Sequence, residues 1–279
     1  MPAVTVTEIT GADDLRKLRD LYLRSWPKHA YTYNTLDNFY RWSKLGCIGD
    51  QCRVYADSHT DWTRTGTFVV KDHNELFFDT LEPSTAKMLY ELLLAVLGSC
   101  GQSVSLVYAP QYREHVIGVA SSLSYSKMHD ERLVCYRQID EQCFNGCLPV
   151  GYQLGPVQHT DCEFVSDEWE HNDPVFANLP TRLIERNPSL GVYDATGQLV
   201  AWCLIDQTGS LAIFKTMPDH RRKGLGRKII ERFARQLRDT GKLPQAFVVE
   251  DNVASRTLFE GCGFKSVDVW YWSKIEKRA

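Results

Sequence analysis

The sequence predicts an α+β fold made of two domains in tandem, each a mixed, mostly antiparallel sheet flanked by helices. The chain has 279 residues, which is enough for two ordinary domains. Segments with an apolar residue at every second position alternate with segments at helical spacing. The order of these segments in the first half recurs in the second half, which indicates an ancient duplication.

The boundary between the domains is predicted within residues 139–156, "IDEQCFNGCLPVGYQLGP", where turn-forming residues cluster and periodicity is lost. The sequence has no linker rich in proline, glycine or serine. We place the first domain at residues 1–142 and the second at 143–279.

The second domain begins with two short helices within residues 161–187, interrupted near 172–174. An antiparallel meander follows, with strands at 190–195, 199–206 and 210–217 joined by tight turns. A helix then starts at Leu225, carries its apolar residues on one face, and ends near Thr240-Gly241. The last elements are a strand at 245–250, a helix that begins after Asn252 and ends at Gly261 or Gly263, and a closing strand at 266–275.

The first domain repeats this order in a degenerate form. Its predicted elements are strands at 52–57, 66–72 and 75–81, a helix at 84–97, a strand at 103–110, a short helix at 111–123 and a strand at 131–139. Ser84 is the predicted cap of the first helix. The aromatic residues of 25–42 fit a helix face and loop packing. Nothing in this half corresponds to the cationic glycine loop of the second half.

Composition and charge exclude several classes of protein. The chain is 43% hydrophobic and 24% charged, as in soluble globular proteins. Its net charge of -3 argues against nucleic-acid binding, and no apolar run approaches the roughly 20 residues that span a bilayer. The start, "MPAVTVTEITGADDL", does not resemble a signal peptide. We expect an intracellular, cytoplasmic protein, with a mitochondrial location left open, that is a monomer or homodimer and binds neither nucleic acid nor membrane.

The nine cysteines are scattered and odd in number, and only Cys143 and Cys147 lie close together. Without a paired C-x-x-C motif, the sequence predicts neither a zinc site nor a disulfide framework. We expect reduced, mostly buried thiols and no bound metal.

Residues 219–233, "DHRRKGLGRKIIERF", are the clearest candidate for a binding site. They join a strand to an amphipathic helix through three cations and two glycines. The first amides of a helix lack intrahelical partners, and the helix dipole adds a partial positive charge there. Glycine lets an anion approach the backbone closely, and Arg221, Arg222 and Lys223 add full charges. The stretch therefore predicts an anion site that is neither a dinucleotide fingerprint nor a Walker loop.

Two motifs in the second half resemble the GNAT superfamily of acyl-CoA-dependent N-acyltransferases. The loop motif R/Q-x-x-G-x-G/A is matched by Arg221, Gly224 and Gly226. The later motif N-x-x-(A/S)-x-x-L-(Y/F)-x-x-x-G-F is matched by Asn252, Ser255, Leu258, Phe259, Gly263 and Phe264. The run Asp206-Gln207-Thr208-Gly209, followed by Thr216, Pro218, Arg221 and Gly224, further resembles the glycine N-acyltransferase-like branch. The resemblance covers roughly residues 145–279.

The resemblance implies that the strand Ala212 to Thr216 splays from the strand near Ala246, and that the pantetheine arm inserts between them. The pyrophosphate would lie on the amides of residues 222–226. The implied cofactor-binding residues are Phe214, Lys215, Thr216, Arg221, Arg222, Lys223, Gly224, Leu225, Gly226, Asn252 and Ser255. The co-substrate would be acetyl-CoA or a longer acyl-CoA. Trp202, Phe214 and the aromatic run at 269–272 would wall a pocket.

The same resemblance leaves the catalytic groups open. The branch expects a glutamate base directly after D-Q-T-G, where this chain has Ser210, and many GNAT enzymes use a tyrosine acid, where it has Phe259. The candidates are Ser210, Glu250 and Asn252, with Asp251 acting through water or His220 as further bases. Positioning of the amine alone is another alternative.

We therefore expect an N-acyltransferase that moves an acyl group from acyl-CoA to the amine of a small acceptor, such as the amino acid glycine. The alternatives are an acyl-CoA-binding protein with little or no turnover and a protein N-acetyltransferase.

Overall fold

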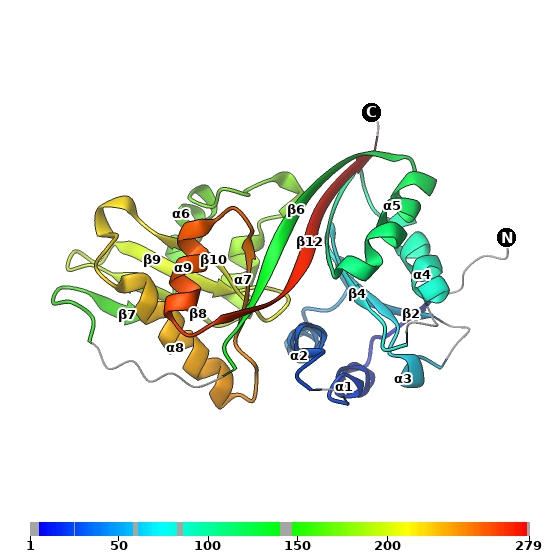
Figure 1. Ribbon diagram of the computed structural model, residues 1–279, viewed down its shortest axis with the longest axis horizontal. Coiled ribbons are helices and arrows are strands. Elements are labelled where there is room, and N and C mark those ends of the chain that lie inside the picture. Colours follow the sequence, from blue (N-terminus) through cyan, green and yellow to red (C-terminus); the bar gives the residue numbers. More distant parts are fainter. Residues whose placement is uncertain (1–5, 25, 58–60, 83–85, 140–146, 278–279) are drawn as a thin grey trace. The chain divides into compact units, whose positions relative to one another are not determined.

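The computed structural model describes residues 6–24, 26–57, 61–82, 86–139 and 147–277, which form two compact units (Figure 1). The first unit comprises Met1–Leu133, Val175–Ala177 and Val269–Ala279, and the second comprises Val134–Pro174 and Asn178–Asp268. The boundary predicted between residues 142 and 143 lies outside the described residues and stays a prediction. The predicted cap Ser84 also lies outside them.

The first unit is a mixed sheet with helices on both faces. Its elements are β1 (Val6–Glu8), α1 (Ala12–Leu21), α2 (Ala30–Lys44), β2 (Cys52–Asp57), α3 (Trp62–Thr65), β3 (Phe68–Asp72), β4 (Glu75–Asp79), α4 (Ala86–Gly98), β5 (Ser103–Tyr108), η2 (Pro110–Tyr112), α5 (Arg113–Ser122) and the start of β6 (Tyr125–Arg137). Strands β1 to β4 form an antiparallel meander, and β5 adds in parallel to β4. Figure 1 shows α1 and α2 on one face and α4 and α5 on the other.

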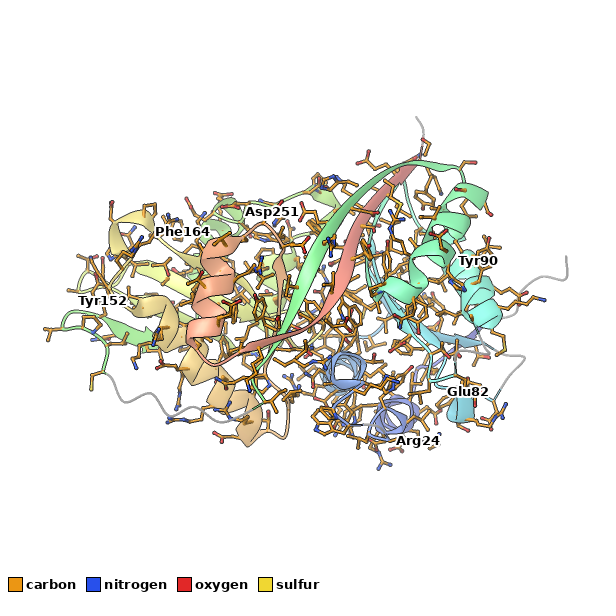
Figure 2. The ribbon with its side chains drawn as sticks, viewed as in Figure 1. Arg24, Glu82, Tyr90, Tyr152, Phe164 and Asp251 are labelled. Carbon is orange, nitrogen blue, oxygen red and sulfur yellow. The ribbon has the colours of Figure 1, made fainter. Side chains whose placement is uncertain are left out.

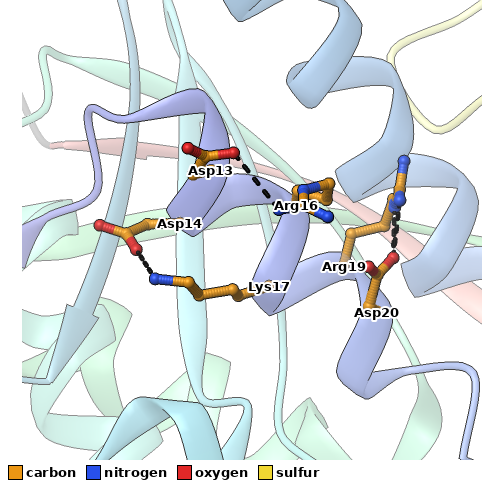
Figure 3. Close-up of polar contacts among 6 residues, drawn as sticks. All are labelled: Asp13, Asp14, Arg16, Lys17, Arg19 and Asp20. Atoms are coloured by element: carbon orange, nitrogen blue, oxygen red, sulfur yellow. Dashed lines mark hydrogen bonds and ion pairs between the residues drawn. The ribbon is translucent and has the colours of Figure 1, made fainter.

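Helix α1 carries its charges in short-range ion pairs, Asp13 with Arg16 and Asp14 with Lys17 (Figure 3). Such exposed pairs contribute about 0.3–0.5 kcal/mol each. Arg19 differs, because its guanidinium bonds to Asp20 of its own helix and also to Asp37 of α2, with N···O distances of 2.7 and 2.8 Å. Arg19 therefore ties the two helices together.

The second unit repeats this plan. Its elements are the end of β6, β7 (Gln153–Gly155), η3 (His159–Asp161), α6 (Cys162–Asp167), α7 (Leu179–Arg186), β8 (Ser189–Tyr193), β9 (Leu199–Ile205), β10 (Leu211–Thr216), η5 (Pro218–His220), α8 (Leu225–Asp239), β11 (Gln245–Val249), α9 (Val253–Gly261) and the start of β12 (Lys265–Lys277). A further short turn of helix is η4 (Pro174–Phe176), of which Pro174 is assigned to the second unit and Val175 and Phe176 to the first. Strands β7 to β10 pair antiparallel, and β11 adds in parallel to β10. The predicted meander, its two turns and the order of the later elements are confirmed.

The last strands of the two repeats are exchanged. Strand β6 closes the first repeat, but from Val134 it belongs to the second unit, where it lies beside β11. Strand β12 closes the second repeat, but from Val269 it belongs to the first unit, where Tyr271–Glu276 pair antiparallel with β5. Each unit thus contains part of the final strand of the other repeat.

The core of the second unit lies between α8 and the meander. The predicted apolar face of α8 is buried: Leu225, Ile229, Ile230, Phe233 and Leu237 are all at most 6% exposed. This face packs against β8, β9 and β10. The helix ends at Asp239, and Gly241 takes a positive φ of 77°, as the sequence predicts. Among the described residues, no helix combines the length and apolar character needed to cross a bilayer.

Replacing Ile229 with alanine should lower the free energy of unfolding by about 2–5 kcal/mol, because this fully buried side chain fills the space between α8 and the sheet. Urea denaturation measures the loss. The matched control is Arg232→Ala on the exposed face of the same helix, which should change the free energy by less than about 0.5 kcal/mol. Equal losses in the two variants would contradict this packing.

Candidate functional site

Strands β10 and β11 pair at a single position and then part. Their register contains only Leu211 opposite Ala246. The corresponding strands of the first unit, β4 and β5, pair at three consecutive positions. A parallel sheet that opens in this way leaves backbone groups of both strands without ladder partners, so a ligand can bond to them.

A bulge in β10 marks where the gap begins. Ala212 lies opposite Leu204 of β9 and Lys215 opposite Trp202, so the register assigns no β9 partner to Ile213 and Phe214. Ile213 has a positive φ of 45°, which is strained for a β-branched residue. Bulges re-aim backbone and side chains, and they occur frequently beside functional sites.

The gap opens into a cavity of about 710 Å³. Its walls come from β10, β11, the loop before α8, the start of α9 and the segment after α6. All the predicted cofactor-binding residues except Lys223 line it: Phe214, Lys215, Thr216, Arg221, Arg222, Gly224, Leu225, Gly226, Asn252 and Ser255. The predicted catalytic residues Ser210 and Glu250 do not line it, whereas Asn252 does.

The loop before α8 presents the start of the helix to the cavity. Arg222 and Gly224 both have positive φ values, 62° and 77°, and Gly224 is the residue that precedes the first turn. The amide of Lys228 bonds to the Gly224 carbonyl oxygen at 3.2 Å, which opens the helical ladder. Successive amides in such a turn form a concave anion site, and the helix dipole reinforces it.

The two glycines of the loop serve different purposes. A Cβ at Gly224 would meet nothing within 4 Å, so this glycine is required by its backbone conformation. A Cβ at Gly226 would lie 2.7 Å from Cζ of Phe214. Gly226 therefore allows α8 to lie close against the ring of Phe214, a packing role that the sequence did not reveal.

The cations of the loop point in different directions. Arg221 donates from Nε to the carbonyl oxygen of Thr216 at 3.0 Å, which joins the loop to the end of β10. Lys223 instead donates to the hydroxyl of Tyr152 at 3.0 Å, and His220 Nδ1 lies 2.9 Å from the same hydroxyl. Tyr152 directly precedes β7 (Figure 2). Its hydroxyl explains why Lys223 is absent from the cavity wall.

Ser210 lies in the tight turn between β9 and β10, where its side chain is fully engaged. Its Oγ is 2.7 Å from Thr208 Oγ1 and accepts a hydrogen bond from Gln245 Nε2 at 3.0 Å. Asp206 Oδ1 accepts hydrogen bonds from the amides of Thr208 and Ser210. Burial raises the pKa of Asp206 to about 6, although these hydrogen bonds oppose the effect. The turn is a largely buried structural unit, and residues 206–210 do not line the cavity.

Asn252 and Phe259 hold α9 at the other side of the gap. The side chain of Asn252 caps the helix by accepting from the Ser255 amide at 3.0 Å. Phe259 is 3% exposed, and its ring stacks on the ring of Tyr136 with a distance of 6.3 Å between the ring centroids. Glu250 accepts a hydrogen bond at its main-chain oxygen from Arg256, at 2.9 Å. Asp251 lies at the turn between β11 and α9 (Figure 2).

Four consecutive residues that the sequence analysis did not single out, Glu168 to His171, line the cavity opposite β10. The carboxylate of Glu168 lies 2.9 Å from Lys215 Nζ, and the same ammonium donates to the Glu168 main-chain oxygen at 2.5 Å. The signal in the sequence was weak, because no spacing links residue 168 to residue 215. The cavity is thus cationic at the α8 loop and carries carboxylates at the 168–170 segment.

The predicted aromatic wall is only partly observed. Trp202 and Phe214 line the cavity, and Phe164 of α6 packs edge-on against Trp202 at 5.6 Å (Figure 2). Trp270 and Trp272 instead belong to the first unit. There the ring of Trp270 packs on that of Tyr31, with 4.2 Å between the ring centroids. The expectation that residues 269–272 wall this pocket is wrong for these two tryptophans, because the exchanged strand carries them into the first unit.

Among the described residues, no group of three or more histidine, cysteine, aspartate or glutamate side chains is arranged to hold a metal ion. The cysteines of the second unit that the structure describes are reduced. Burial raises the pKa of the Cys262 thiol to about 11, and it raises that of Cys203 as well.

Comparison with known proteins identifies the fold. A family model described as FR47-like protein matches residues 189–273, a stretch that contains the gap and the glycine loop. A Drosophila protein of solved structure has a TM-score of 0.83 at 18% identity, covering 99% of this chain and 100% of its own. A tandem GNAT protein from the clavulanic acid biosynthesis pathway has a TM-score of 0.54 at 14% identity, covering 99% of each chain.

A GCN5-related N-acetyltransferase from Sphaerobacter thermophilus is similar over 100% of this chain and 97% of its own, with a TM-score of 0.52 at 11% identity. At such low identities the likeness is evidence about fold alone. The chain has the α+β, GNAT-like fold that the sequence predicts, and the tandem relative agrees with its two domains.

Replacing Gly226 with alanine should lower the free energy of unfolding by about 1–3 kcal/mol, because the new methyl group forces α8 and the Phe214 ring apart. Adding Phe214→Leu should recover part of the loss, giving a favourable coupling in a double-mutant cycle. Gly224→Ala is the matched control, since its cost comes from a positive φ and no ring is involved. If the coupling free energy of Phe214→Leu with Gly226→Ala equalled that with Gly224→Ala, the proposed contact would be contradicted.

The raised pKa of Asp206 predicts a pH dependence of stability. Because the folded state holds this proton up to a pKa of about 6, against an ordinary value of 3.8, the contribution of Asp206 to stability falls as pH rises between those values. The difference between the two pKa values corresponds to about 3 kcal/mol. Asp206→Asn keeps a side-chain oxygen acceptor and should lose this dependence.

Urea denaturation of the wild-type protein and Asp206→Asn at pH 4, 5, 6 and 7 measures the effect. The wild-type free energy of unfolding minus that of the variant should decrease across the series. A constant difference would show that Asp206 titrates normally.

Proposed function

We propose that the protein is an acyl-CoA-dependent N-acyltransferase that moves the acyl group of acetyl-CoA, or of a longer acyl-CoA, to the amine of a small acceptor. The observation that carries the proposal is the gap between β10 and β11, which leads directly to the glycine loop at the start of α8. An extended thiol-bearing arm fits the gap, and a diphosphate fits the loop.

The cofactor would lie along β10 as an added strand. The backbone groups of Phe214 and Thr216 would bond to the pantetheine amides, in the manner of a peptide that joins a sheet edge. The amides of residues 222–226 would hold the pyrophosphate, with Arg221 and Arg222 supplying charge. Asn252 and Ser255 would lie near the thiol end.

The geometry supports acyl transfer more than simple capture of coenzyme A. The cavity is also lined by Trp202 and by the 168–171 segment, and we propose that an acceptor binds there beside the thioester. An amine held against the carbonyl carbon gains the rate advantage of proximity, about 7–11 kcal/mol of the barrier in well-oriented cases. The register assigns no β9 partner to Ile213 and Phe214, so we propose that their backbone amides donate to the developing oxyanion.

The acceptor class is proposed from sequence similarity. The Asp206-Gln207-Thr208-Gly209 turn resembles that of the glycine N-acyltransferase-like branch, and it favours an amino acid such as glycine among small amines. A second candidate function is acyl-CoA binding with little turnover. It is favoured by Ser210 and Phe259, which stand where a base and an acid are expected.

Incubating the purified protein with acetyl-CoA or longer acyl-CoAs and a panel of amines, glycine included, tests the proposal through the release of free thiol. We expect release above the rate without amine for at least one pair. Tight binding of coenzyme A by calorimetry with no release for any pair would favour the binding protein. Absence of binding and of release would refute both functions.

Replacing Gly224 with alanine should weaken coenzyme A binding at least about tenfold, a loss of about 1.4 kcal/mol, because the loop amides leave their positions when φ is forced negative. The matched control is Gly197→Ala. Gly197 has a similar positive φ of 83° and equally empty surroundings, but it lies in the turn before β9 and away from the cavity. Calorimetry that gives both folded variants the wild-type affinity would contradict the role of the loop.

A further inference from the structure

The two positions where a base and an acid are expected cannot transfer a proton in this chain. The hydroxyl of Ser210 is buried and bonded to Thr208 and Gln245. Phe259 carries no titratable group, and its ring is packed against Tyr136. Acyl transfer to an amine nevertheless needs a group that takes the proton of the attacking nitrogen. That group must face the cavity.

The described residues that line the cavity include two carboxylates, Glu168 and Glu170, and two histidines, His171 and His220. His220 belongs to the cationic loop and lies 2.9 Å from the Tyr152 hydroxyl, at the end where the diphosphate would bind. Glu170 is exposed. His171 is partly buried and its ring packs edge-on against Trp169 at 6.2 Å.

Glu168 differs from the other three residues in being fixed from the facing strand. Lys215 bonds to its carboxylate at 2.9 Å and to its main-chain oxygen at 2.5 Å. The side chain of Glu168 is 34% exposed and that of Lys215 is 23% exposed. A charge-assisted pair with two contacts restricts the carboxylate to a small region, as a catalytic group requires.

The position of Lys215 in β10 sets where the carboxylate lies. Lys215 stands between Phe214 and Thr216, whose backbone groups would bond to the pantetheine arm, and opposite Trp202 of β9 in the register. Lys215 directly follows the bulge at Ile213 and Phe214, where the carbonyl group of the thioester would lie, so the carboxylate that it bonds is held beside that part of β10.

We infer that Glu168 is the base of the transfer reaction and that Lys215 positions it; this rests on the proposed function. The neutral amine attacks the carbonyl carbon, the C–N bond forms and the carbonyl pair moves to oxygen. Glu168 takes the N–H proton of the adduct, whose nitrogen is far more acidic than the free amine. As the C–S bond breaks, the departing thiolate receives that proton, and the amide, free coenzyme A and an ionised Glu168 result.

Acetyl-CoA, together with the amine of the panel that gives the fastest thiol release, tests the assignment. Glu168→Gln should lower kcat by about 10²-fold or more while leaving coenzyme A affinity by calorimetry unchanged, and Glu168→Asp should retain part of the activity. Glu163→Gln is the matched control: it lies on α6, is exposed and does not line the cavity, so it should keep wild-type kcat. His171→Gln tests the strongest competing base.

Lys215→Met should lower kcat with little change in KM for acetyl-CoA, and Lys215→Arg should restore most of the loss, because a guanidinium can still hold the carboxylate. A merely structural lysine would change coenzyme A affinity or thermal stability instead.

The outcomes separate this inference from the proposed function. An active wild type whose Glu168→Gln variant keeps its kcat overturns the role of Glu168 and leaves the function intact. A large loss in His171→Gln, with Glu168→Gln unaffected, moves the base to the histidine. A wild type without thiol release for any amine refutes the function and this inference together.

Discussion

The site depends on one constraint, the parting of two parallel strands after a single paired position. Leu211 and Ala246 hold β10 and β11 together at one end, and the bulge at Ile213 and Phe214 turns β10 away beyond it. Unpaired backbone groups are costly when buried without partners, so the gap is stable only because it is open to water or to a ligand. The equivalent strands β4 and β5 remain paired, which explains why the first unit has a GNAT-like plan without an equivalent gap.

The electrostatics of the cavity follow the direction of the proposed reaction. Cations of the loop would hold a diphosphate, and the ion pair of Glu168 with Lys215 lies beside the bulge of β10, where an amine would approach the thioester. Strand β10 joins these two sets of charges, because Lys215 is followed by Thr216, whose carbonyl oxygen accepts the hydrogen bond from Arg221 of the loop. A single strand thus fixes the distance between the anion site and the carboxylate.

Much of the second unit could be predicted from its sequence. Apolar periodicity located α8, turn chemistry located the meander, and the glycine spacing located the loop at residues 221–226. What escaped prediction depends on contacts between distant residues: the 2.7 Å approach that explains Gly226, the Tyr152 hydroxyl that draws Lys223 aside, and the Glu168–Lys215 pair. Trp270 and Trp272 were misplaced for the same reason, since no local pattern indicates which neighbouring strand and which unit a strand will join.

The exchange of β6 and β12 has a consequence for how this chain could have evolved from a shorter one. If either repeat were expressed alone, it would keep its own final strand but lose the strand of the other repeat that now pairs with β5 or β11. The isolated repeat would have to pair its own last strand with β5 or β11. Otherwise it would expose an unpaired strand edge, which promotes edge-to-edge aggregation. Gene fusion followed by strand exchange is therefore hard to reverse, and a first repeat without a ligand gap can persist because its partner needs the strand that it donates.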